Sequence, residues 1–349
     1  MTLYIGVDFH PHQQTVACCD TVDGEIRFLK FEHSDESAIR QFYRDVEAPA
    51  VIGVEATGGL DWFEEMIFEN GHKMLVGKPQ EIRRRARSRH KSDKRDAETI
   101  LDLLMHKEFP EIWRRDKQSR VTLEMLKFRQ NLVKQRTSVS NQLQAVARKR
   151  GLPRFATSTK KGRKLFLAAE LSESDSYLRD SLYKLIDELN AQIKEVDGRL
   201  ENLARKNEQA KLLMTHSGVG VQTALAVTAT LGDVSRFNNM RQVSAFVGLD
   251  PLNKSSGETI RMGRISKRGS RVCRFLLGQA AARSSDPRLR ASYKRISSRR
   301  TTAVAKVAAA RRLLANCYIM LRDGIDYAEF TRRGEVGLHE TTRASKREV

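Results

Sequence analysis

Short apolar runs alternate with amphipathic stretches over the first 110 residues of the chain. In the segment LYIGVDF, residues 3–9, apolar side chains occupy every second position, which is the period of a β-strand with one buried face. Comparable runs and turn signals predict further strands with intervening helices, and this alternation favours an α/β N-terminal domain over residues 1–110. The expected strands lie near residues 14–19, 26–32, 51–56 and 73–77, and the expected helices near residues 34–46, 61–70, 79–89 and 93–106.

Sevenfold spacing of apolar residues characterises the middle of the chain, residues 111–208. Two such series predict two long helices packed as a coiled-coil hairpin or between subunits. Gly151 and Pro153 in RKRGLPRF end the first helix. The outer faces are rich in Lys and Arg, so this arm could bind nucleic acid as well as mediate assembly. The first series is Met125, Leu132, Val139 and Val146, and the second is Leu182, Leu189, Val196 and Leu203, with Leu178 and Leu185 as an added seam.

A change of character near residue 209 marks a third, mainly α-helical domain, residues 209–349. The segment THSGVGVQTALAVTATLGDVSRF sets a G-x-G turn between two helical stretches, which is the sequence form of a helix-hairpin-helix element. Such a turn presents backbone N–H groups to a phosphate at a helix N-terminus. Close packing of the two helices explains the glycines about equally well, so both interpretations stay open.

Four acidic residues stand at strand ends or where core residues are expected. Asp8 lies in the first strand, and Glu55 ends the apolar run VIGVEATG. Asp93 and Asp96 begin SDKRDAETILDLL, on the helical face that carries its apolar residues. Taken singly, each acid has a simpler explanation, as a turn residue, an N-cap (Asp93) or a first-turn acid (Asp96). Buried unpaired carboxylates are costly, however, and the order strand, strand, helix is how an RNase H-like fold gathers carboxylates around two metal ions. The arrangement therefore predicts a divalent-metal site of the phosphoryl-transfer type.

Charge is distributed unevenly along the 349-residue chain, which has a formal net charge of +20. Residues 1–80 carry 6 Lys and Arg against 14 Asp and Glu, whereas residues 254–349 carry 23 basic and 8 acidic side chains. Such asymmetry is typical of a protein with a polyanionic partner, and nucleic acid is the partner we expect. No lipidation signal, membrane-length apolar run or signal peptide is evident, so we expect a cytoplasmic protein without a membrane partner.

The four cysteines show no spacing that is typical of a metal site. Cys18 and Cys19 are adjacent, and Cys273 and Cys317 stand alone. We therefore expect four reduced packing residues and no zinc site.

Two basic segments are candidates for binding a nucleic-acid backbone. The run RRRARSRHKSDKR begins with Arg83, Arg84 and Arg85 and leads into the acidic helix, although a solvated helix face is the simpler explanation. In the last domain, Ser255 and Ser256 lie in a polar loop before a dense cationic stretch. A serine in a loop is usually a turn residue, but a hydroxyl within a cationic field could attack a backbone phosphate. The basic residues of that stretch include Arg261, Arg264, Lys267, Arg268 and Arg271.

These segments together resemble the insertion-sequence-110 family of transposases, which includes the Piv-type DNA invertases. The resemblance covers nearly the whole chain. It rests on YIGVDFH, GVEATGG and KSDKRDAETIL in the first domain, and on SGVGVQTA, RQVSAFVGLDP and SSGETIRMGRISKRGSRVCRFLL in the last. It implies a RuvC-like nuclease fold for the first domain, whose acidic DEDD tetrad matches Asp8, Glu55, Asp93 and Asp96.

The same resemblance implies a serine nucleophile in the last domain, the transposase domain. The family's serine precedes a glycine, five residues beyond the proline of GLDP, and this count from Pro251 reaches Ser256. Ser255 is adjacent, so that alternative stays open. Ser217 stands where many relatives have proline, a departure that bears on the helix-hairpin-helix element and not on the chemistry.

Members of this family are RNA-guided DNA recombinases, and the resemblance extends that expectation to the chain. The implied partners are donor and target DNA, a structured noncoding guide RNA (bridge RNA), and further copies of the chain in a dimer or tetramer. The implied cofactor is Mg²⁺, with Mn²⁺ as an alternative, held by the tetrad. Ser256 would attack the scissile phosphate and leave a 5′-phosphoserine linkage that conserves the phosphodiester energy.

Two other functions fit the same residues. A RuvC-like metal-dependent nuclease or junction resolvase would use water as its nucleophile and would keep its activity in Ser256→Ala. A non-catalytic RNA- or DNA-binding scaffold would tolerate Asp8→Asn, although all four acids are present in the chain.

Overall fold

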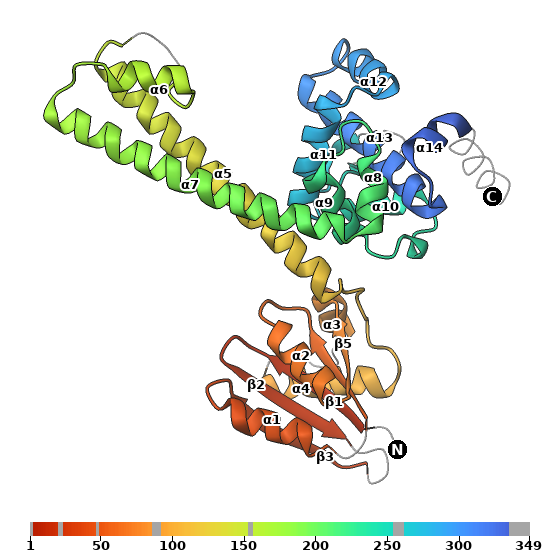
Figure 1. Cartoon of the computed structure of the whole chain (residues 1–349). Helices are drawn as coiled ribbons and strands as arrows, with labels where there is room; N and C mark the ends of the chain where they lie inside the picture. The colour runs from red at the N-terminus through yellow and green to blue at the C-terminus, as the bar shows by residue number, and fades with distance from the viewer. Residues whose placement is uncertain are drawn as a thin grey trace. The chain divides into compact units, whose positions relative to one another are not determined.

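The computed structural model describes residues 3–19, 24–46, 49–85, 92–152, 156–253 and 262–334. The chain divides into two compact units, Met1–Arg114 and Arg115–Val349, and each is described by itself. The first unit contains a sheet with helices, and the second is built mostly of helices (Figure 1). The division into three domains, with boundaries at residues 110 and 208, stays a prediction.

The first unit is a five-stranded sheet with helices on both faces, and its α/β character agrees with the prediction. Its strands are β1 (Leu3–Phe9), β2 (Gln13–Cys19), β3 (Ile26–Glu32), β4 (Ala50–Glu55) and β5 (Lys73–Gly77). Its helices are α1 (Glu36–Arg44), α2 (Asp61–Glu69), α3 (Pro79–Arg85) and α4 (Asp93–Met105). The strand order is β3-β2-β1-β4-β5, with β1 to β3 antiparallel and β4 and β5 parallel to β1. These are the order and directions of an RNase H-like sheet.

Alternate residues of β1 pack on opposite faces of this sheet. Ile5 and Val7 are fully buried in a core with α1 and α2, where Tyr43 and Phe63 are also fully buried. The intervening residues of β1, including Gly6, point to the other face, which α4 covers. The apolar alternation of the first strand thus separates a hydrophobic face from the face that carries Asp8.

Helix α4 approaches its face of the sheet so closely that Gly6 has no room for a side chain and Gly53 is crowded by side chains of the helix. A Cβ on Gly6 would lie 2.2 Å from the carbonyl oxygen of Ala97 and 2.6 Å from the backbone nitrogen of Leu101. A Cβ on Gly53 would lie 2.8 Å from a methyl carbon of Leu104. Because the atoms opposite Gly6 belong to the backbone, a larger residue there would have to move the helix itself.

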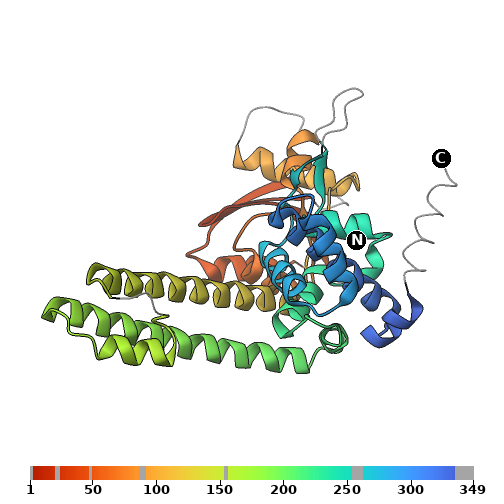
Figure 2. The same ribbon diagram turned by 90° about the horizontal axis from the view of Figure 1, so that it is seen from above.

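The second unit begins with a helix hairpin. α5 (Lys117–Lys149) and α7 (Glu173–Arg205) are each 33 residues long and lie side by side, with the short α6 (Lys160–Leu167) between them in sequence (Figure 1, Figure 2). They are antiparallel, since Arg129 pairs with Asp197 whereas Arg150 pairs with Asp175. As predicted, the first helix ends before Gly151, which has a positive φ of 67°.

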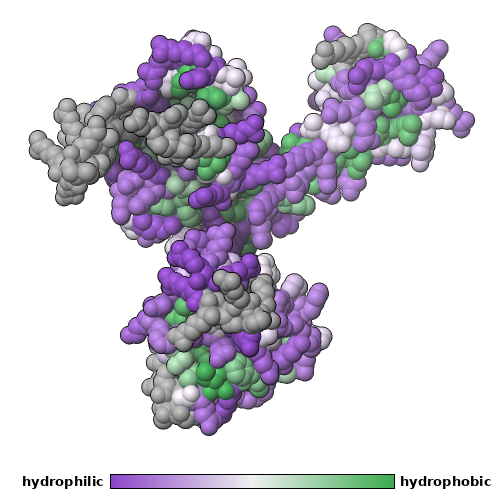
Figure 3. Space-filling view, turned by 180° about the vertical axis from the view of Figure 1, so that it is seen from behind, coloured by the Kyte–Doolittle hydropathy of each residue, from purple (hydrophilic) through white to green (hydrophobic). Residues whose placement is uncertain are grey.

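The heptad residues lie on the face that the two long helices share, but the added seam does not. Leu178 is 47% exposed and Leu185 is 43% exposed, so neither is buried within the hairpin, and packing of this second seam between subunits stays a prediction. A single partner helix buries one stripe of each helix, and residues beside that stripe stay in solvent. Figure 3 shows a mostly hydrophilic surface along the hairpin, and coiled-coil packing stays a prediction. Leu132, Val139, Leu189 and Val196 are buried, and Met125, Val146, Leu182 and Leu203 pack against the same core with partial exposure.

The rest of the second unit is mainly helical, in agreement with the sequence prediction. Its helices are α8 (Glu208–Met214), α9 (Val221–Leu231), α10 (Met240–Val247), α11 (Arg271–Arg283), α12 (Pro287–Ser297), α13 (Thr302–Asp323) and α14 (Tyr327–Arg333), with a 3₁₀ turn at Val234–Arg236. A two-stranded antiparallel sheet, β6 (Pro251–Asn253) and β7 (Met262–Ile265), lies between α10 and α11 in the sequence. Among the described helices, none combines the length and the apolar character needed to cross a bilayer.

All four cysteines are free thiols. Cys273 and Cys317 are fully buried, and burial raises the pKa of each thiol to about 12. They are packing residues, as expected from their sequence context.

Gly6→Ala is expected to destabilise the first unit by about 1–3 kcal/mol, because the new methyl group would meet backbone atoms of α4. Trp62 and Trp113 are the two tryptophans of the chain and both belong to this unit, so urea unfolding followed by tryptophan fluorescence reports on it. Gly58→Ala is the matched control, since nothing lies within 4 Å of a Cβ built at Gly58. Equal unfolding midpoints for the two variants would contradict the close contact.

Candidate metal centre

Two parallel strands bring two acidic residues to one edge of the sheet. β1 and β4 are parallel neighbours in register, so Asp8 and Glu55 lie next to each other near their carboxyl ends. Asp8 faces α4, because it lies two positions after Gly6 along the strand. Helix α4 contributes Asp93 and Asp96 from its first turn. The fold therefore gathers four acids that the sequence distributes over three segments.

A cavity of about 420 Å³ lies at this edge of the sheet, and three of the four acids line it. Asp8, Glu55 and Asp96 share its wall with His10. Asp93, the fourth acid, lies close to Asp8 and His10. One ligand atom from each of Asp8, His10 and Asp93 lies within 4.8 Å of the others. Asp8 and His10 belong both to this set and to the set that lines the cavity, and Asp8 is the acid that the two sets have in common.

Asp8 is a buried carboxyl group with two acidic neighbours. It is 9% exposed, and this burial raises its pKa. The carboxylates of Asp96 and Asp93 act in the same direction, whereas His10 lowers the pKa of Asp8. Burial disfavours the charged form because the protein interior solvates it poorly. A divalent cation among these oxygens would offset that penalty, and carboxylates are the ligands that Mg²⁺ prefers, so the donor set fits such an ion.

Helix α4 begins with a serine cap and not with Asp93. The Oγ of Ser92 accepts a hydrogen bond from the backbone N–H of Arg95 at 3.4 Å, so the interpretation of Asp93 as the N-cap is wrong. Asp93 and Asp96 are half-buried first-turn acids, a position that the helix dipole favours. The amide of Gln13 donates a hydrogen bond to Oδ2 of Asp93 at 3.2 Å and helps to hold that carboxylate.

His10 is the residue of this centre that sequence reasoning missed. Its Nε2 lies 3.1 Å from Oδ2 of Asp8 and 4.0 Å from Oδ1 of Asp93. The available signal was its place two residues after Asp8, where the strand passes into a turn. Spacing alone could not show that the turn directs the imidazole back toward two carboxylates.

The three arginines at the end of α3 have different surroundings. Arg83 lines the cavity, and its Nη2 lies 3.2 Å from Oε1 of Glu55. Arg84 pairs with Glu81, one turn earlier on the same helix. Arg85 donates a hydrogen bond to the backbone carbonyl of Glu108. Of these arginines, Arg83 is the one placed to meet a ligand of the acidic centre.

The predicted nucleophile lies outside the described residues, as do its neighbour Ser255 and the basic residue Arg261. Ser256 falls in the segment 254–261, between β6 and β7. The residues that border this segment are paired with each other, Asn253 with Met262. The other predicted nucleic-acid-binding residues of the second unit are exposed, and they are Arg264, Lys267, Arg268 and Arg271.

The two glycines of the G-x-G turn before α9 have different roles. Gly218 has a φ of 92°, and a Cβ there would lie 2.7 Å from the Cα of Ser284. Close packing therefore accounts for Gly218. Gly220 is the N-cap of α9, and nothing lies within 4 Å of a Cβ built on it. For Gly220 the phosphate-binding alternative stays a prediction.

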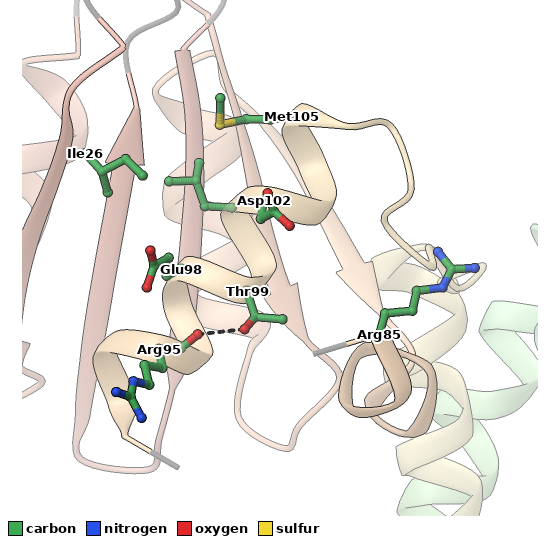
Figure 4. A pocket seen from close by; sticks show the side chains of 8 residues that line it. Ile26, Arg85, Arg95, Glu98, Thr99, Asp102 and Met105 are labelled. Atoms are coloured by element: carbon green, nitrogen blue, oxygen red, sulfur yellow. Dashed lines mark hydrogen bonds between the residues drawn. The ribbon is translucent and has the colours of Figure 1, made fainter. Parts of the chain in front are cut away.

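A second cavity, of about 300 Å³, lies beside α4 (Figure 4). Arg95, Glu98 and Asp102 line it from α4, and Ile26 lines it from β3. Within it, the hydroxyl of Thr99 donates a hydrogen bond to the carbonyl oxygen of Arg95 at 2.8 Å. The four acids of the centre are not among the described residues that line this cavity, and we assign it no role.

Comparison with known proteins gives matches in both units. Residues 5–149 match a DEDD transposase model of IS110, and residues 210–294 match the model of the transposase IS116/IS110/IS902 family. The chain is 28% identical to a probable family 20 transposase of Pseudomonas aeruginosa, over 78% of this chain and 77% of that protein. It is 30% identical to the transposase for insertion sequence element IS1111A of Coxiella burnetii, over 64% of this chain and 63% of that protein.

Among solved structures, the chain is similar to T. thermophilus RuvC in complex with Holliday junction substrate. That similarity covers 32% of this chain and 100% of the RuvC chain, with 10% sequence identity and a TM-score of 0.25.

Mg²⁺ or Mn²⁺ is expected to stabilise the first unit, and Asp8→Asn should abolish the effect. A ligand that binds only the folded chain adds about 2.7 kcal/mol to the free energy of unfolding at 100 times its dissociation constant. Without metal, Asp8→Asn should be no less stable than the wild type near neutral pH. The pKa of Asp8 is raised in the folded chain, so near neutral pH the charged carboxylate is less favourable in the folded than in the unfolded state. Asn carries no charge and avoids this penalty. Tryptophan-detected unfolding with and without cation measures both effects.

Glu98→Gln is the control for this measurement, because it removes one negative charge from an exposed position of α4 outside the centre. It should keep the full stabilisation by the cation. If Asp8→Asn keeps it as well, the cation binds elsewhere.

Proposed function

Because the chain belongs to the IS110 family of transposases, we propose that it is a DNA transposase that cleaves and rejoins DNA strands. The observation that carries the proposal is the gathering of the DEDD set, Asp8, Glu55, Asp93 and Asp96, at one edge of the sheet. Matches to family models in both units support the same activity. Donor and target DNA are the substrates that this activity requires.

We propose that the four acids hold a divalent cation, Mg²⁺ or Mn²⁺. The cation, when bound, would neutralise charge that develops on the scissile phosphate. The chain itself provides the carboxylates and limits access of water to Asp8 by burying it. Arg83, beside Glu55 in the cavity, would exchange its ion pair for one with the DNA phosphate.

Ser256 is our proposed nucleophile, on the basis of its match to the family's serine. Its Oγ would form a new bond to phosphorus as the bond from phosphorus to the 3′-oxygen breaks. The serine proton is lost and the 3′-oxygen gains one, which leaves a 3′-hydroxyl end and a 5′-phosphoserine. Reversal of this step with another 3′-hydroxyl rejoins strands without an external energy source. The exposed side chains of Arg264, Lys267 and Arg268 would bind adjacent phosphates.

We further propose a structured noncoding guide RNA and additional copies of the chain as partners. Both are implied by family membership, and the net charge of +20 suits a chain that binds two polyanions. Residues 254–349 carry the largest excess of basic side chains, so the second unit is where we expect most of the RNA and DNA contacts. A dimer or tetramer would allow acids and serine from different copies to act on one phosphate.

Ser256→Ala is expected to abolish both the covalent protein–DNA adduct and DNA rearrangement. The chain would be expressed with its native flanking DNA, lysed under denaturing conditions and treated with nuclease. Mass spectrometry would then detect a nucleotide remnant on Ser256. Ser255→Ala is the matched control, since it removes a hydroxyl from the adjacent residue and should keep the adduct. Cleavage by Ser256→Ala with no adduct in the wild type would instead identify a nuclease that uses water.

Arg83→Gln is expected to reduce DNA cleavage by about 10²-fold, because it removes a cation aimed at the phosphate that reacts. Arg84→Gln is a matched control with the same change of charge on the same helix, and the two arginine side chains are 65% and 71% exposed. It should weaken binding slightly and leave the cleavage rate of bound DNA unchanged. Single-turnover cleavage at saturating protein separates an effect on the cleavage rate from an effect on DNA binding. Equal losses in both variants would mean that Arg83 contributes only general electrostatic attraction.

A further inference from the structure

The acidic centre contains an imidazole in addition to its carboxylates. His10 is 47% exposed in its side chain, so its position against Asp8 does not follow from hydrophobic burial. The Nε2 atom faces two of the four acids, at 3.1 Å from Asp8 and 4.0 Å from Asp93. Its role therefore has to be sought in the centre itself.

The backbone holds His10 in this position. β1 and β2 are joined by a turn of three residues, His10, Pro11 and His12, and the backbone N–H of His10 donates to the carbonyl of Gln13 at 2.9 Å. The same turn is fixed from β3, since the backbone N–H of His33 donates to the carbonyl of His12 at 2.7 Å. A turn closed on both sides presents the imidazole at small entropic cost.

The two distances from His10 in this group are short enough for its nitrogen and the carboxylates to bind one ion. Octahedral sites with bonds of about 2.0–2.1 Å place adjacent ligand atoms about 3 Å apart and opposite ones about 4 Å apart. The separations of 3.1 Å between His10 and Asp8 and of 4.0 Å between His10 and Asp93 lie within this range, so the three residues could hold one ion together. Gln13 holds Asp93 from the other side at 3.2 Å.

Two groups of donors therefore share Asp8 and His10. One lines the cavity together with Glu55 and Asp96, and the other includes Asp93. We infer that His10 provides a nitrogen ligand to a divalent cation bound with Asp8 and Asp93, which makes the centre favour Mn²⁺ over Mg²⁺. An imidazole is a better ligand for first-row transition ions than for Mg²⁺, which prefers oxygen. The inference rests on the proposed metal-dependent function and specifies the ligand set of the same centre.

A hydrogen bond from His10 to Asp8 is the competing explanation for the same geometry. In that case the histidine orients the carboxylate, and its nitrogen never contacts the ion. The two roles differ in a direct observable, because a nitrogen bound to Mn²⁺ shows a magnetic coupling that a more distant nitrogen lacks.

The test uses the full chain and Mn²⁺ alone as the probe. Pulsed electron paramagnetic resonance of the Mn²⁺-bound protein should show coupling to a directly bound ¹⁴N nucleus in the wild type. His10→Ala should lose this coupling, and its Mn²⁺ dissociation constant should rise by at least about 10–100-fold, because the loss of a residue that only supports a metal ligand already costs that much. The dissociation constant for Mg²⁺, measured by competition, should change less.

His12→Ala is the matched control, since His12 is an exposed histidine of the same turn. It should keep both the coupling and the affinity. Unchanged tryptophan fluorescence in both variants verifies that the first unit stays folded.

Three results would overturn the inference. Bound Mn²⁺ without ¹⁴N coupling in the wild type, or coupling that persists in His10→Ala, excludes His10 as a ligand while the acidic site stands. Equal losses of Mn²⁺ and Mg²⁺ affinity in His10→Ala would indicate an orienting hydrogen bond. If the wild type binds Mn²⁺ no better than Asp8→Asn does, the proposed metal-dependent function fails along with the inference.

Discussion

The close approach of α4 to strand β1 at Gly6 is the contact on which the acidic centre depends. The backbone of the helix occupies the space where a side chain would stand, so strand and helix are held at a fixed separation. Asp8 follows two residues after this contact on the strand, and Asp96 precedes Ala97 by one residue on the helix. A backbone contact therefore sets the distance between carboxylates from two different elements. Side-chain packing alone would leave that distance free to vary.

This arrangement concentrates negative charge where water is partly excluded. Burial raises the pKa of Asp8, and two neighbouring carboxylates act in the same direction. Three cationic or polar side chains of the described part of this unit lie against the cluster, namely His10 beside Asp8, Gln13 beside Asp93 and Arg83 beside Glu55. Of the three, only Arg83 carries a permanent positive charge, so the cluster as a whole keeps an excess of negative charge. Such an excess of negative charge is what a divalent cation would neutralise, and the bound cation would then attract the phosphate.

The elements of the first unit could be predicted from sequence because their pattern is local. Strand alternation and helical periodicity gave all five strands, and the acids at the ends of the strands and at the start of α4 indicated where they would meet. The rest depends on tertiary context. Leu178 and Leu185 have heptad spacing, but the one partner helix within the chain leaves them exposed. His10 was missed because its role depends on how a three-residue turn closes, and the alternative of Asp93 as a helix cap fails because Ser92 takes that position.

The proposed chemistry is divided between the two units of the chain, and this division bears on how cleavage would be controlled. The acids belong to the unit Met1–Arg114, whereas Ser256 belongs to the sequence of the unit that follows. The acids alone carry what a nuclease that uses water needs, so a chain whose serine was absent would tend toward hydrolysis and loss of the strand end. If the serine attacks the phosphate before water does, the energy of the phosphodiester bond is kept in the covalent linkage, although the same acidic centre is used. Under the proposed mechanism, the two groups in separate units would meet only on assembly with nucleic acid, and cleavage would then be restricted to complexes able to rejoin the strands.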